Sequence, residues 1–155
     1  MTNYIDYSFT IKVEIESTLK DVNVTKEPFA IYLSGIDTYG EISSVSRSDV
    51  NIVAVVNPNT NQILLISIPR DYYVQLSGTT GYKDKLTHAG IYGIDMSVNT
   101  IKDLIGIEID YYVKVNFSTL VQVVDIIGGI DIYSDKGFRS YTDRSVYIPK
   151  GKVHM

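Results

Sequence analysis

Three carboxylates and two arginines stand beside apolar runs in the first half of this sequence, at a spacing that allows them to meet: Asp37, Arg47, Asp49, Arg70 and Asp71. Two neighbouring carboxylates repel each other unless a cation or a proton lies between them. Their hard oxygen atoms suit a magnesium ion that also holds substrate phosphates. The planar guanidinium groups match phosphate oxygens with two parallel hydrogen bonds each. We therefore interpret this set as a candidate site for phosphate or pyrophosphate chemistry.

The elements that must position these side chains are short strands. Three runs rich in Val, Ile and Leu, bounded by Gly, Pro, Asn and Ser, predict mostly buried strands over residues 29–36, 50–57 and 62–68. Residues 57–61 form a turn cluster, so the second and third strands are expected to pair as an antiparallel hairpin. If the first strand is also antiparallel to the second, Asp37, Asp49 and Arg70 become neighbours at one edge of the sheet.

The rest of the chain alternates helices with strands. Apolar spacing and turn signals predict strands over residues 72–76, 111–117 and 130–133, and helices over residues 84–93, 96–104 and 119–127. We expect Asp95 and Ser118 to cap the second and third helices, which end near Gly106 and Gly128. This order predicts an α/β fold, close to a three-layer arrangement, in which helices cover a mixed central β-sheet. Residues 134–155 form a polar tail with five lysines and arginines.

An accessory segment precedes this domain. Residues 8–16 alternate apolar and polar side chains, a pattern typical of a half-buried edge strand. The polar stretch that follows ends in Glu27-Pro28 and is expected to be a connection. We therefore assign residues 1–27 to an accessory strand and linker, and residues 28–155 to the main domain.

The composition narrows the class of protein. With 155 residues and 45% hydrophobic content, the chain can bury a core, and one domain is the expected count. The formal net charge of −4 argues against a general nucleic-acid footprint. The sequence has no cysteine, no apolar run long enough to span a membrane and no signal-peptide layout. It also lacks the motifs of nucleoside triphosphatases, dinucleotide enzymes, zinc proteases and serine hydrolases.

Five motifs of this sequence resemble the LytR-CpsA-Psr family of bacterial cell-envelope proteins, most closely its CpsA-type members. In the family's order they are Ser34-Gly35-Ile36-Asp37, Ser46-Arg47-Ser48-Asp49-Val50-Asn51, Ser67-Ile68-Pro69-Arg70-Asp71, Lys85-Leu86-Thr87-His88-Ala89-Gly90 and Val124-Asp125-Ile126-Ile127-Gly128-Gly129-Ile130. They extend over about residues 28–133, and as an ordered set they are far more specific than any one alone.

The resemblance implies an extracytoplasmic α/β domain that binds a polyprenyl-pyrophosphate-linked glycan, either a capsular polysaccharide or a teichoic-acid-like polymer. It implies transfer of the phosphoglycan to a hydroxyl of peptidoglycan, with Mg²⁺ at the pyrophosphate. Position by position, Asp37 and Asp49 would hold the metal, and Arg47, Arg70 and Lys85 would contact the pyrophosphate. The lipid would lie in an apolar groove between sheet and helices.

The resemblance also bears on the ends of the chain. Family members continue with a segment that contains an Ala-Leu pair and several arginines at about the point where this sequence stops. We therefore expect a C-terminally incomplete domain, with the activity belonging to the parent protein. The parent protein is expected at the extracytoplasmic face of the cell membrane, anchored by an N-terminal transmembrane segment outside this sequence.

Alternatives stay open at the level of residues and of function. Asp71 would either orient an arginine or serve as a base. Without the resemblance, Asp37 is a turn residue, Arg70 and Asp71 form a surface ion pair, and Lys85 belongs to a solvated charged loop. The alternative function is a module that binds lipid-linked glycan or a partner protein without catalysis. A DNA-binding regulator, in line with older names in this family, has little physical support.

Overall fold

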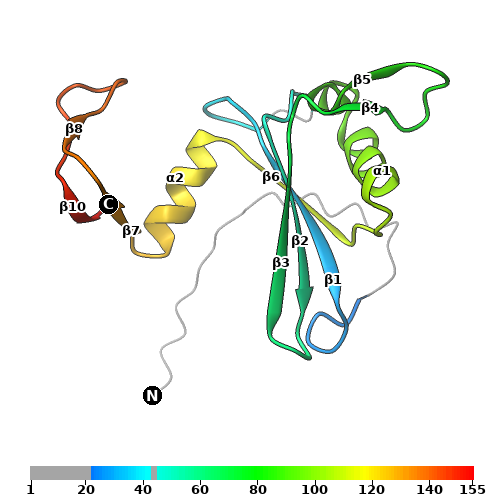
Figure 1. The fold of residues 1–155 in the computed structure, drawn as a ribbon, viewed down its shortest axis with the longest axis horizontal. Helices are drawn as coiled ribbons and strands as arrows, with labels where there is room; N and C mark the ends of the chain where they lie inside the picture. Colours follow the sequence, from blue (N-terminus) through cyan, green and yellow to red (C-terminus); the bar gives the residue numbers. More distant parts are fainter. Residues whose placement is uncertain (1–21, 43–44) are drawn as a thin grey trace. The chain divides into compact units, whose positions relative to one another are not determined.

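The computed structural model describes residues 22–42 and 45–155, which form two compact units that divide after Asn116. The first unit contains β1 (Phe29–Gly35), β2 (Val50–Asn57), β3 (Gln62–Ile68), β4 (Tyr73–Gln75), β5 (Lys83–Lys85), the 3₁₀ helix η1 (Leu86–Tyr92), α1 (Ile94–Ile105) and β6 (Tyr111–Val115) (Figure 1). The second contains α2 (Phe117–Ile126), β7 (Asp131–Ser134), β8 (Phe138–Arg139), β9 (Tyr147–Ile148) and β10 (Gly151–His154). The predicted accessory strand over residues 8–16 lies outside the described residues.

The main sheet is mixed, as predicted, and its strand order is β3-β2-β1-β6. Strand β2 pairs antiparallel with both β1 and β3, which confirms the first three predicted strands and the hairpin. Strand β6 pairs parallel with β1. Gly35 lies opposite Val50, and Asn51 lies opposite Ile68. The end of β1, the start of β2 and the end of β3 therefore share one edge of the sheet, where the charged residues were predicted to meet.

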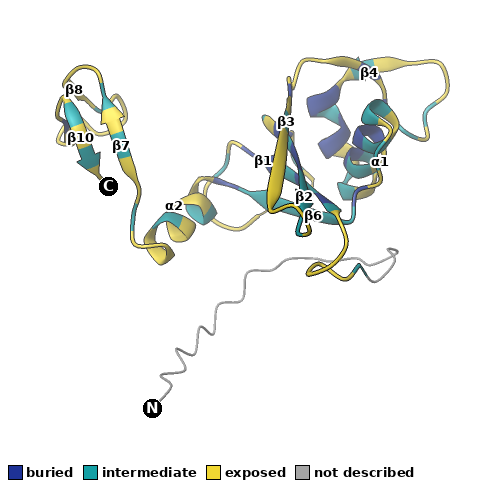
Figure 2. Ribbon diagram, turned by 60° about the horizontal axis from the view of Figure 1, so that its bottom comes forward, coloured by how far each residue is buried: buried dark blue, intermediate teal, exposed yellow. Residues whose placement is uncertain are grey.

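One face of this sheet carries the core of the first unit. Ala30 and Tyr32 alternate along β1 toward this face, and Val53 lies opposite Tyr32 on β2. These residues form one buried cluster with Ile101 of α1 and Ile109, so the helix covers this face (Figure 2). Burying apolar area of this kind supplies the main favourable free energy of folding.

Helix α1 ends as predicted but begins differently. Gly106 adopts the left-handed conformation and donates its N–H to the carbonyl of Lys102 at 2.8 Å. The helix starts at Ile94, directly after Gly93 with φ 106°, so the predicted N-cap role of Asp95 is wrong. Asp95 lies in the first turn instead, where its carboxylate interacts favourably with the helix dipole. A glycine that turns the chain sharply set the boundary here, ahead of the acidic residue.

The predicted helix over residues 84–93 is wrong at its start and in its type. Lys83–Lys85 forms strand β5, which pairs antiparallel with β4, and a 3₁₀ helix follows it. The apolar residues that suggested a helix are Leu86, Ala89 and Tyr92, which are spaced by three. This spacing matches the three residues per turn of a 3₁₀ helix. Leu86 and Ala89 are both buried, so tertiary packing fixes this geometry.

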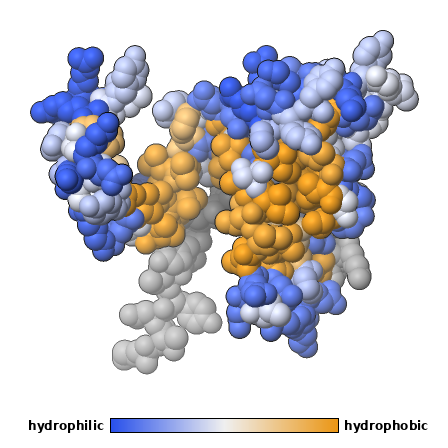
Figure 3. Space-filling view, viewed as in Figure 1, coloured by the Kyte–Doolittle hydropathy of each residue, from blue (hydrophilic) through white to orange (hydrophobic). Residues whose placement is uncertain are grey.

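The second face of the main sheet exposes apolar side chains. Val50, Ile63 and Leu65 lie on it, and each is half-exposed or more. Figure 3 shows a continuous apolar patch over the strands of this unit. In the described part of the first unit, helices therefore cover one face of the sheet. The expected mixed α/β fold is confirmed, but these residues place no helix on the second face, so they do not form three layers.

The second unit combines one helix with small strand pairs. Helix α2 begins at Phe117, two residues earlier than predicted, so Ser118 lies in its first turn and is not the N-cap. Gly128 and Gly129 follow the helix with positive φ angles, as predicted for its end. The predicted strand over residues 130–133 is confirmed as β7. The polar tail contains β8, β9 and β10, which the sequence did not predict, and β10 pairs with β7.

Candidate functional site

The site is built at the shared edge of β1, β2 and β3. The backbone N–H of Asp49 donates to the carbonyl of Gly35 at 2.8 Å, which fixes Asp49 beside the end of β1. The Arg70 guanidinium comes from the end of β3 and donates to the Asp49 carboxylate at 2.5 Å. The predicted contact between Asp49 and Arg70 is therefore confirmed, although 21 residues separate them.

This pair continues into a row of alternating charges. Arg70 Nε lies 3.7 Å from the carboxylate of Asp71, and Lys85 Nζ of β5 lies 2.6 Å from the other oxygen of Asp71. The ammonium of Lys85, and then Arg70, hold the pKa of Asp71 below its ordinary value. The Asp49 carboxylate raises the pKa of Arg70. All three side chains of Arg70, Asp71 and Lys85 are about half exposed, so these pairs set orientation and add little stability.

Arg47 is held at the same edge by the backbone on both sides of it. The N–H of Ser46 donates to the carbonyl of Gly90 at 3.1 Å, and the N–H of Ser48 donates to the carbonyl of Thr87 at 3.3 Å. The Arg47 side chain is exposed, and no carboxylate of the described residues forms an ion pair with it. Its guanidinium is therefore available to an anion from solvent.

Asp37 lies two residues beyond β1 and is exposed. The N–H of the preceding Ile36 donates to the carbonyl of Val115 at 2.9 Å, so the chain is still attached to the sheet at this point. The structure places Asp37 and Asp49 at the same edge but does not join their carboxylates. Within residues 22–42 and 45–155, no group of three or more His, Asp or Glu side chains is arranged to hold a metal ion.

A buried polar cluster under the edge was missed by the sequence reasoning. Ser48 Oγ lies 2.8 Å from Ser34 Oγ and donates to Asn51 Oδ1 at 2.7 Å, and Tyr32 Oη also donates to Asn51 Oδ1. All four residues are almost fully buried. Burial raises the pKa of Tyr32, which keeps its hydroxyl protonated as a donor. The sequence feature that could have revealed this cluster is the presence of two polar residues, Ser34 and Asn51, within predicted strands that are otherwise mainly apolar.

This cluster fixes the charged residues above it. Ser48 stands between Arg47 and Asp49, so the bonds of its buried hydroxyl hold both neighbours in place. A buried polar group that loses its partner costs about 1–3 kcal/mol, so the loop has one strongly preferred conformation. The cluster acts on the site through position and does not itself reach solvent.

Helix η1 joins the two charged loops. In addition to its bonds to Ser46 and Ser48, it binds the loop after β3, because the N–H of Thr87 donates to the carbonyl of Arg70 at 2.9 Å. The N–H of Leu86 donates to the carbonyl of Tyr72 at the same distance. The segment after Lys85 therefore sets the separation between Arg47 and Arg70.

The arrangement can bind a diphosphate, but not by its own charge alone. The six predicted site residues comprise three cations and three carboxylates: Arg47, Arg70, Lys85, Asp37, Asp49 and Asp71. Their formal charges cancel, so the negative charge of a diphosphate is not balanced by them. A divalent cation held by one or two of these carboxylates and by phosphate oxygens would supply the balance.

Comparison with known proteins gives one consistent result. The LytR_cpsA_psr family model matches residues 4–155. The polyisoprenyl-teichoic acid–peptidoglycan teichoic acid transferase TagU of Bacillus anthracis is 34% identical over 166 residues, which cover 96% of this chain and 53% of that protein. The chain therefore spans about half the length of the curated relatives that it matches.

Two solved structures extend this likeness to the fold. The crystal structure of B. subtilis TagV is 38% identical, with a TM-score of 0.72, over 84% of this chain and 52% of that one. A structure of TagT with bound octaprenyl pyrophosphate lipid is 30% identical, with a TM-score of 0.69, over 88% of this chain and 56% of that one.

Proposed function

This chain belongs to the LytR-CpsA-Psr family, and we propose that the whole protein attaches a polyprenyl-pyrophosphate-linked glycopolymer to peptidoglycan. The observation that carries the proposal is the row Asp49, Arg70, Asp71 and Lys85, together with Arg47, which forms no ion pair with another described residue. Such a row presents several phosphate-binding groups at one exposed edge. Relatives that are 34–38% identical are named as teichoic acid transferases, and a relative that is 30% identical was solved with a bound octaprenyl pyrophosphate lipid.

The proposed reaction is a phosphoryl transfer. The oxygen of a peptidoglycan hydroxyl bonds to the phosphorus that carries the glycan, and the bond from this phosphorus to the bridging oxygen breaks. The hydroxyl proton passes to solvent, and polyprenyl phosphate leaves. Arg47 and Arg70 bind the transferred and the departing phosphate, where donors placed in advance stabilise the negative charge that moves onto the leaving group.

Asp71 acts in this proposal by positioning other groups. It accepts from Lys85 and lies beside Arg70, so it fixes the two cations relative to each other. Its lowered pKa makes it a weak proton acceptor at neutral pH, which disfavours the role of a general base. Lys85 then contributes a point charge toward the phosphates.

Mg²⁺ fits the donor set of this edge. Asp37 and Asp49 would hold it, together with oxygens of the substrate's pyrophosphate. When bound, the ion would neutralise phosphate charge and polarise the phosphoryl oxygens. Asp49 also binds Arg70, so the same carboxylate would fix one arginine relative to the ion.

The lipid is proposed to lie on the apolar face of the main sheet. Val50 follows Asp49 directly, is 50% exposed and lies on this face, so the apolar surface begins beside the charged site. Ile63 and Leu65 continue it. A cover over this face would leave an apolar groove for a polyprenyl chain.

The proposed location is the extracytoplasmic face of the cell membrane, with the whole protein anchored there. Among residues 22–42 and 45–155, no helix combines the length and apolar character needed to cross a membrane. The substrates proposed are therefore a lipid in that membrane and the neighbouring peptidoglycan. A nucleic-acid partner is not proposed, because the net charge is −4.

A transfer assay with the whole protein tests the function. It measures the joining of a lipid-linked glycan to peptidoglycan by Arg70→Ala and by Arg144→Ala, a matched variant of an arginine in the second unit. Loss of one charge-assisted hydrogen bond is worth about 1.5–3 kcal/mol, so Arg70→Ala should lower kcat/KM about 10- to 150-fold. Arg144→Ala should leave it unchanged.

Two outcomes would contradict the proposal. Equal turnover by Arg70→Ala and the parent protein would exclude the site. Binding of lipid-linked glycan by the parent protein without any product would favour the alternative, a module that binds the glycan without catalysis.

A further inference from the structure

A histidine and an aspartate form a pair next to Lys85, the last member of the charged row. His88 lies in η1, and its Nδ1 lies 2.8 Å from Oδ1 of Asp84, four residues earlier in β5. The His88 side chain is 29% exposed and the Asp84 side chain 43%, so solvent reaches the pair only in part. Lys85 stands between the two residues in the sequence, and the site described above uses neither of them.

The carboxylate of Asp84 holds the backbone of Lys85. At this end of the β4–β5 pair, the ladder bond runs from the N–H of Leu86 to the carbonyl of Tyr72 at 2.9 Å. Successive N–H groups of a strand point to opposite sides, so the N–H of Lys85 points away from β4. It donates to Asp84 Oδ1 at 2.7 Å. One oxygen atom therefore accepts from both Lys85 and His88.

The same bond fixes which nitrogen of His88 carries a proton. An ionised carboxylate only accepts hydrogen bonds, so Nδ1 is the donor in both the neutral and the charged ring. The pKa of Asp84 is held below its ordinary value, first by the hydrogen bond from His88 and then by the N–H of Lys85, so this carboxylate is ionised at neutral pH. In the neutral ring, Nε2 then carries a lone pair and cannot donate to a phosphate oxygen. The geometry favours a role of His88 through Asp84 over direct contact with a substrate phosphate.

Helix η1 gives His88 a fixed base. Its backbone accepts hydrogen bonds from the N–H groups of Ser46 and Ser48 and donates one to the carbonyl of Arg70. These bonds do not involve the His88 side chain. Arg47 and Arg70 should therefore keep their places when the imidazole ring is removed.

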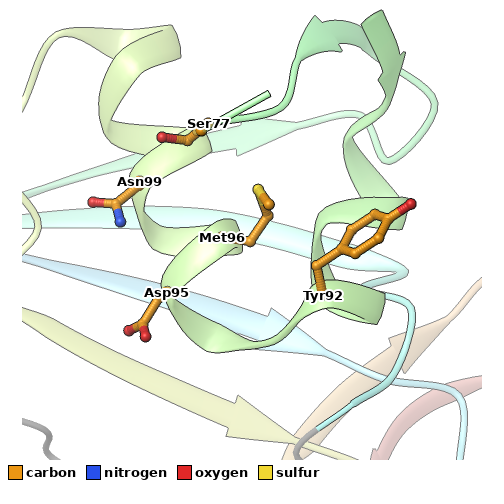
Figure 4. Close-up of a pocket in the computed structure, with 6 residues that line it drawn as sticks. Ser77, Tyr92, Asp95, Met96 and Asn99 are labelled. Atoms are coloured by element: carbon orange, nitrogen blue, oxygen red, sulfur yellow. The ribbon is translucent and has the colours of Figure 1, made fainter. Parts of the chain in front are cut away.

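The far end of η1 brings no binding groups together. The ring of Tyr92, the last residue of η1, is 65% exposed and points away from Asp95 and Asn99 of α1 (Figure 4). These three side chains do not converge on one point. The part of η1 with a role at the charged row is therefore the part that follows Lys85.

Lys85 depends on local bonds, because β5 is a weak element. This strand has three residues, and in the described part of the chain it pairs with the equally short β4 in a sheet separate from the main one. A two-stranded pair is marginally stable by itself. The Lys85 ammonium binds Asp71 at 2.6 Å, but both side chains are more than half exposed, so this ion pair holds the strand weakly.

We propose that His88 is a positioning residue for phosphate binding: through Asp84, it holds Lys85 where the ammonium meets the pyrophosphate of the substrate. The proposal rests on the function proposed above and adds a residue to its site. The path runs from the anchored η1 through the imidazole ring to the Asp84 carboxylate, and from there to the backbone N–H of Lys85. Removal of the ring leaves all three cations in the site but loosens one of them.

The test measures Kd of the whole protein for polyprenyl pyrophosphate by calorimetry. His88→Ala removes the donor, whereas His88→Asn keeps one, because the amide nitrogen takes the place of Nδ1 and nothing takes the place of Nε2. Lys85→Ala, alone and combined with His88→Ala, completes a double-mutant cycle. His154→Ala is the matched control, because His154 also pairs with a carboxylate, that of Asp131 at 2.9 Å, in the second unit.

His88→Ala should lower the affinity for the lipid about 3- to 10-fold, and His88→Asn and His154→Ala should bind like the parent protein. The double variant should bind no more weakly than Lys85→Ala alone, because a histidine that acts through Lys85 has no effect once the ammonium is gone. Additive losses would overturn the proposal. So would an equal loss in His88→Asn and His88→Ala, which would assign a direct contact to Nε2.

A second variant keeps the test independent of the fold of His88→Ala. Asp84→Ala should lower the affinity by the same factor, and full affinity of this variant, with a Tm that shows it is folded, would also overturn the proposal. Arg70→Ala and Lys85→Ala separate the positioning role from the proposed function. If both bind the lipid like the parent protein, the proposed function is refuted; if both lose affinity and His88→Ala does not, only the role of His88 is refuted.

Discussion

Gly90 is the position where one added methyl group should disturb the site most directly. A Cβ atom at Gly90 would meet the carbonyl oxygen of Ser46 at less than the 3.0 Å that real Cβ atoms keep. The obstacle is backbone and cannot rotate away. Gly90 also accepts the hydrogen bond from the N–H of Ser46, so the two segments can separate only by breaking it. Gly90→Ala should therefore push η1 away from the loop that carries Arg47 and Asp49.

The cost can be estimated from two contributions. Overpacking of a well-packed contact costs about 1–3 kcal/mol, and loss of the Ser46 to Gly90 hydrogen bond costs about 0.5–1.5 kcal/mol. A total of about 2–4 kcal/mol lowers Tm by about 5–15 °C in a protein of this size. The displaced loop should also weaken binding of polyprenyl pyrophosphate by about tenfold, because Arg47 and Asp49 no longer share the edge with Arg70.

The assay combines thermal denaturation with a binding titration on the same preparation. Gly81→Ala is the matched control, because Gly81 has a φ of 82° and an added Cβ there meets open space. Its cost is backbone strain of about 1–2 kcal/mol, and the affinity for the lipid should stay unchanged. An unchanged Tm and Kd in Gly90→Ala, or an equal loss of lipid affinity in Gly81→Ala, would refute the proposed role of the contact between Gly90 and Ser46.

Three further predictions concern the same edge. Ser48→Ala should lower the free energy of unfolding in urea by about 1–3 kcal/mol, because Asn51 loses a buried donor; an unchanged midpoint would contradict this. Arg70→Lys should lower the affinity for the lipid about tenfold in a calorimetric titration, because an ammonium cannot form the two parallel hydrogen bonds of a guanidinium; full affinity would show that charge alone suffices. The pKa of Asp71 is lowered, chiefly by Lys85, so this pair should stabilise the fold above the ordinary carboxyl value of 3.8 and lose that effect only as the pH falls through the lower folded value. An NMR titration should give a midpoint below 3.8 that rises in Lys85→Gln, and an equal midpoint in both proteins would exclude the pair.

The edge itself was predictable because it follows from alternation and turns. The runs of Val and Ile fixed which residues are strands, and the turn after Asn57 fixed the hairpin. With β1 antiparallel to β2, the contact between Asp49 and Arg70 is a consequence of topology. Lys85 was predicted as a site residue only from the order of the family motifs, because no local pattern distinguishes it from a solvated lysine.

Other features could not be derived from local patterns. The geometry of η1 depends on packing between two loops that are distant in the sequence. The buried bonds of Ser48 depend on Tyr32 and Asn51 from two different strands, and only the register brings them together. The short strands β8 and β9 have too few residues to give a period. The metal-binding roles of Asp37 and Asp49 stay predictions, because they depend on a substrate that supplies the remaining ligands.

The central claim, that this edge binds a pyrophosphate together with a divalent cation, is tested most directly by isothermal calorimetry of the whole protein with a polyprenyl pyrophosphate. The titration is made in Mg²⁺ and in excess EDTA. We predict that EDTA weakens binding at least tenfold, that Arg70→Ala weakens it in both buffers, and that Asp37→Ala removes the difference between the buffers. The same Kd in Mg²⁺, in EDTA and in Arg70→Ala would contradict the account.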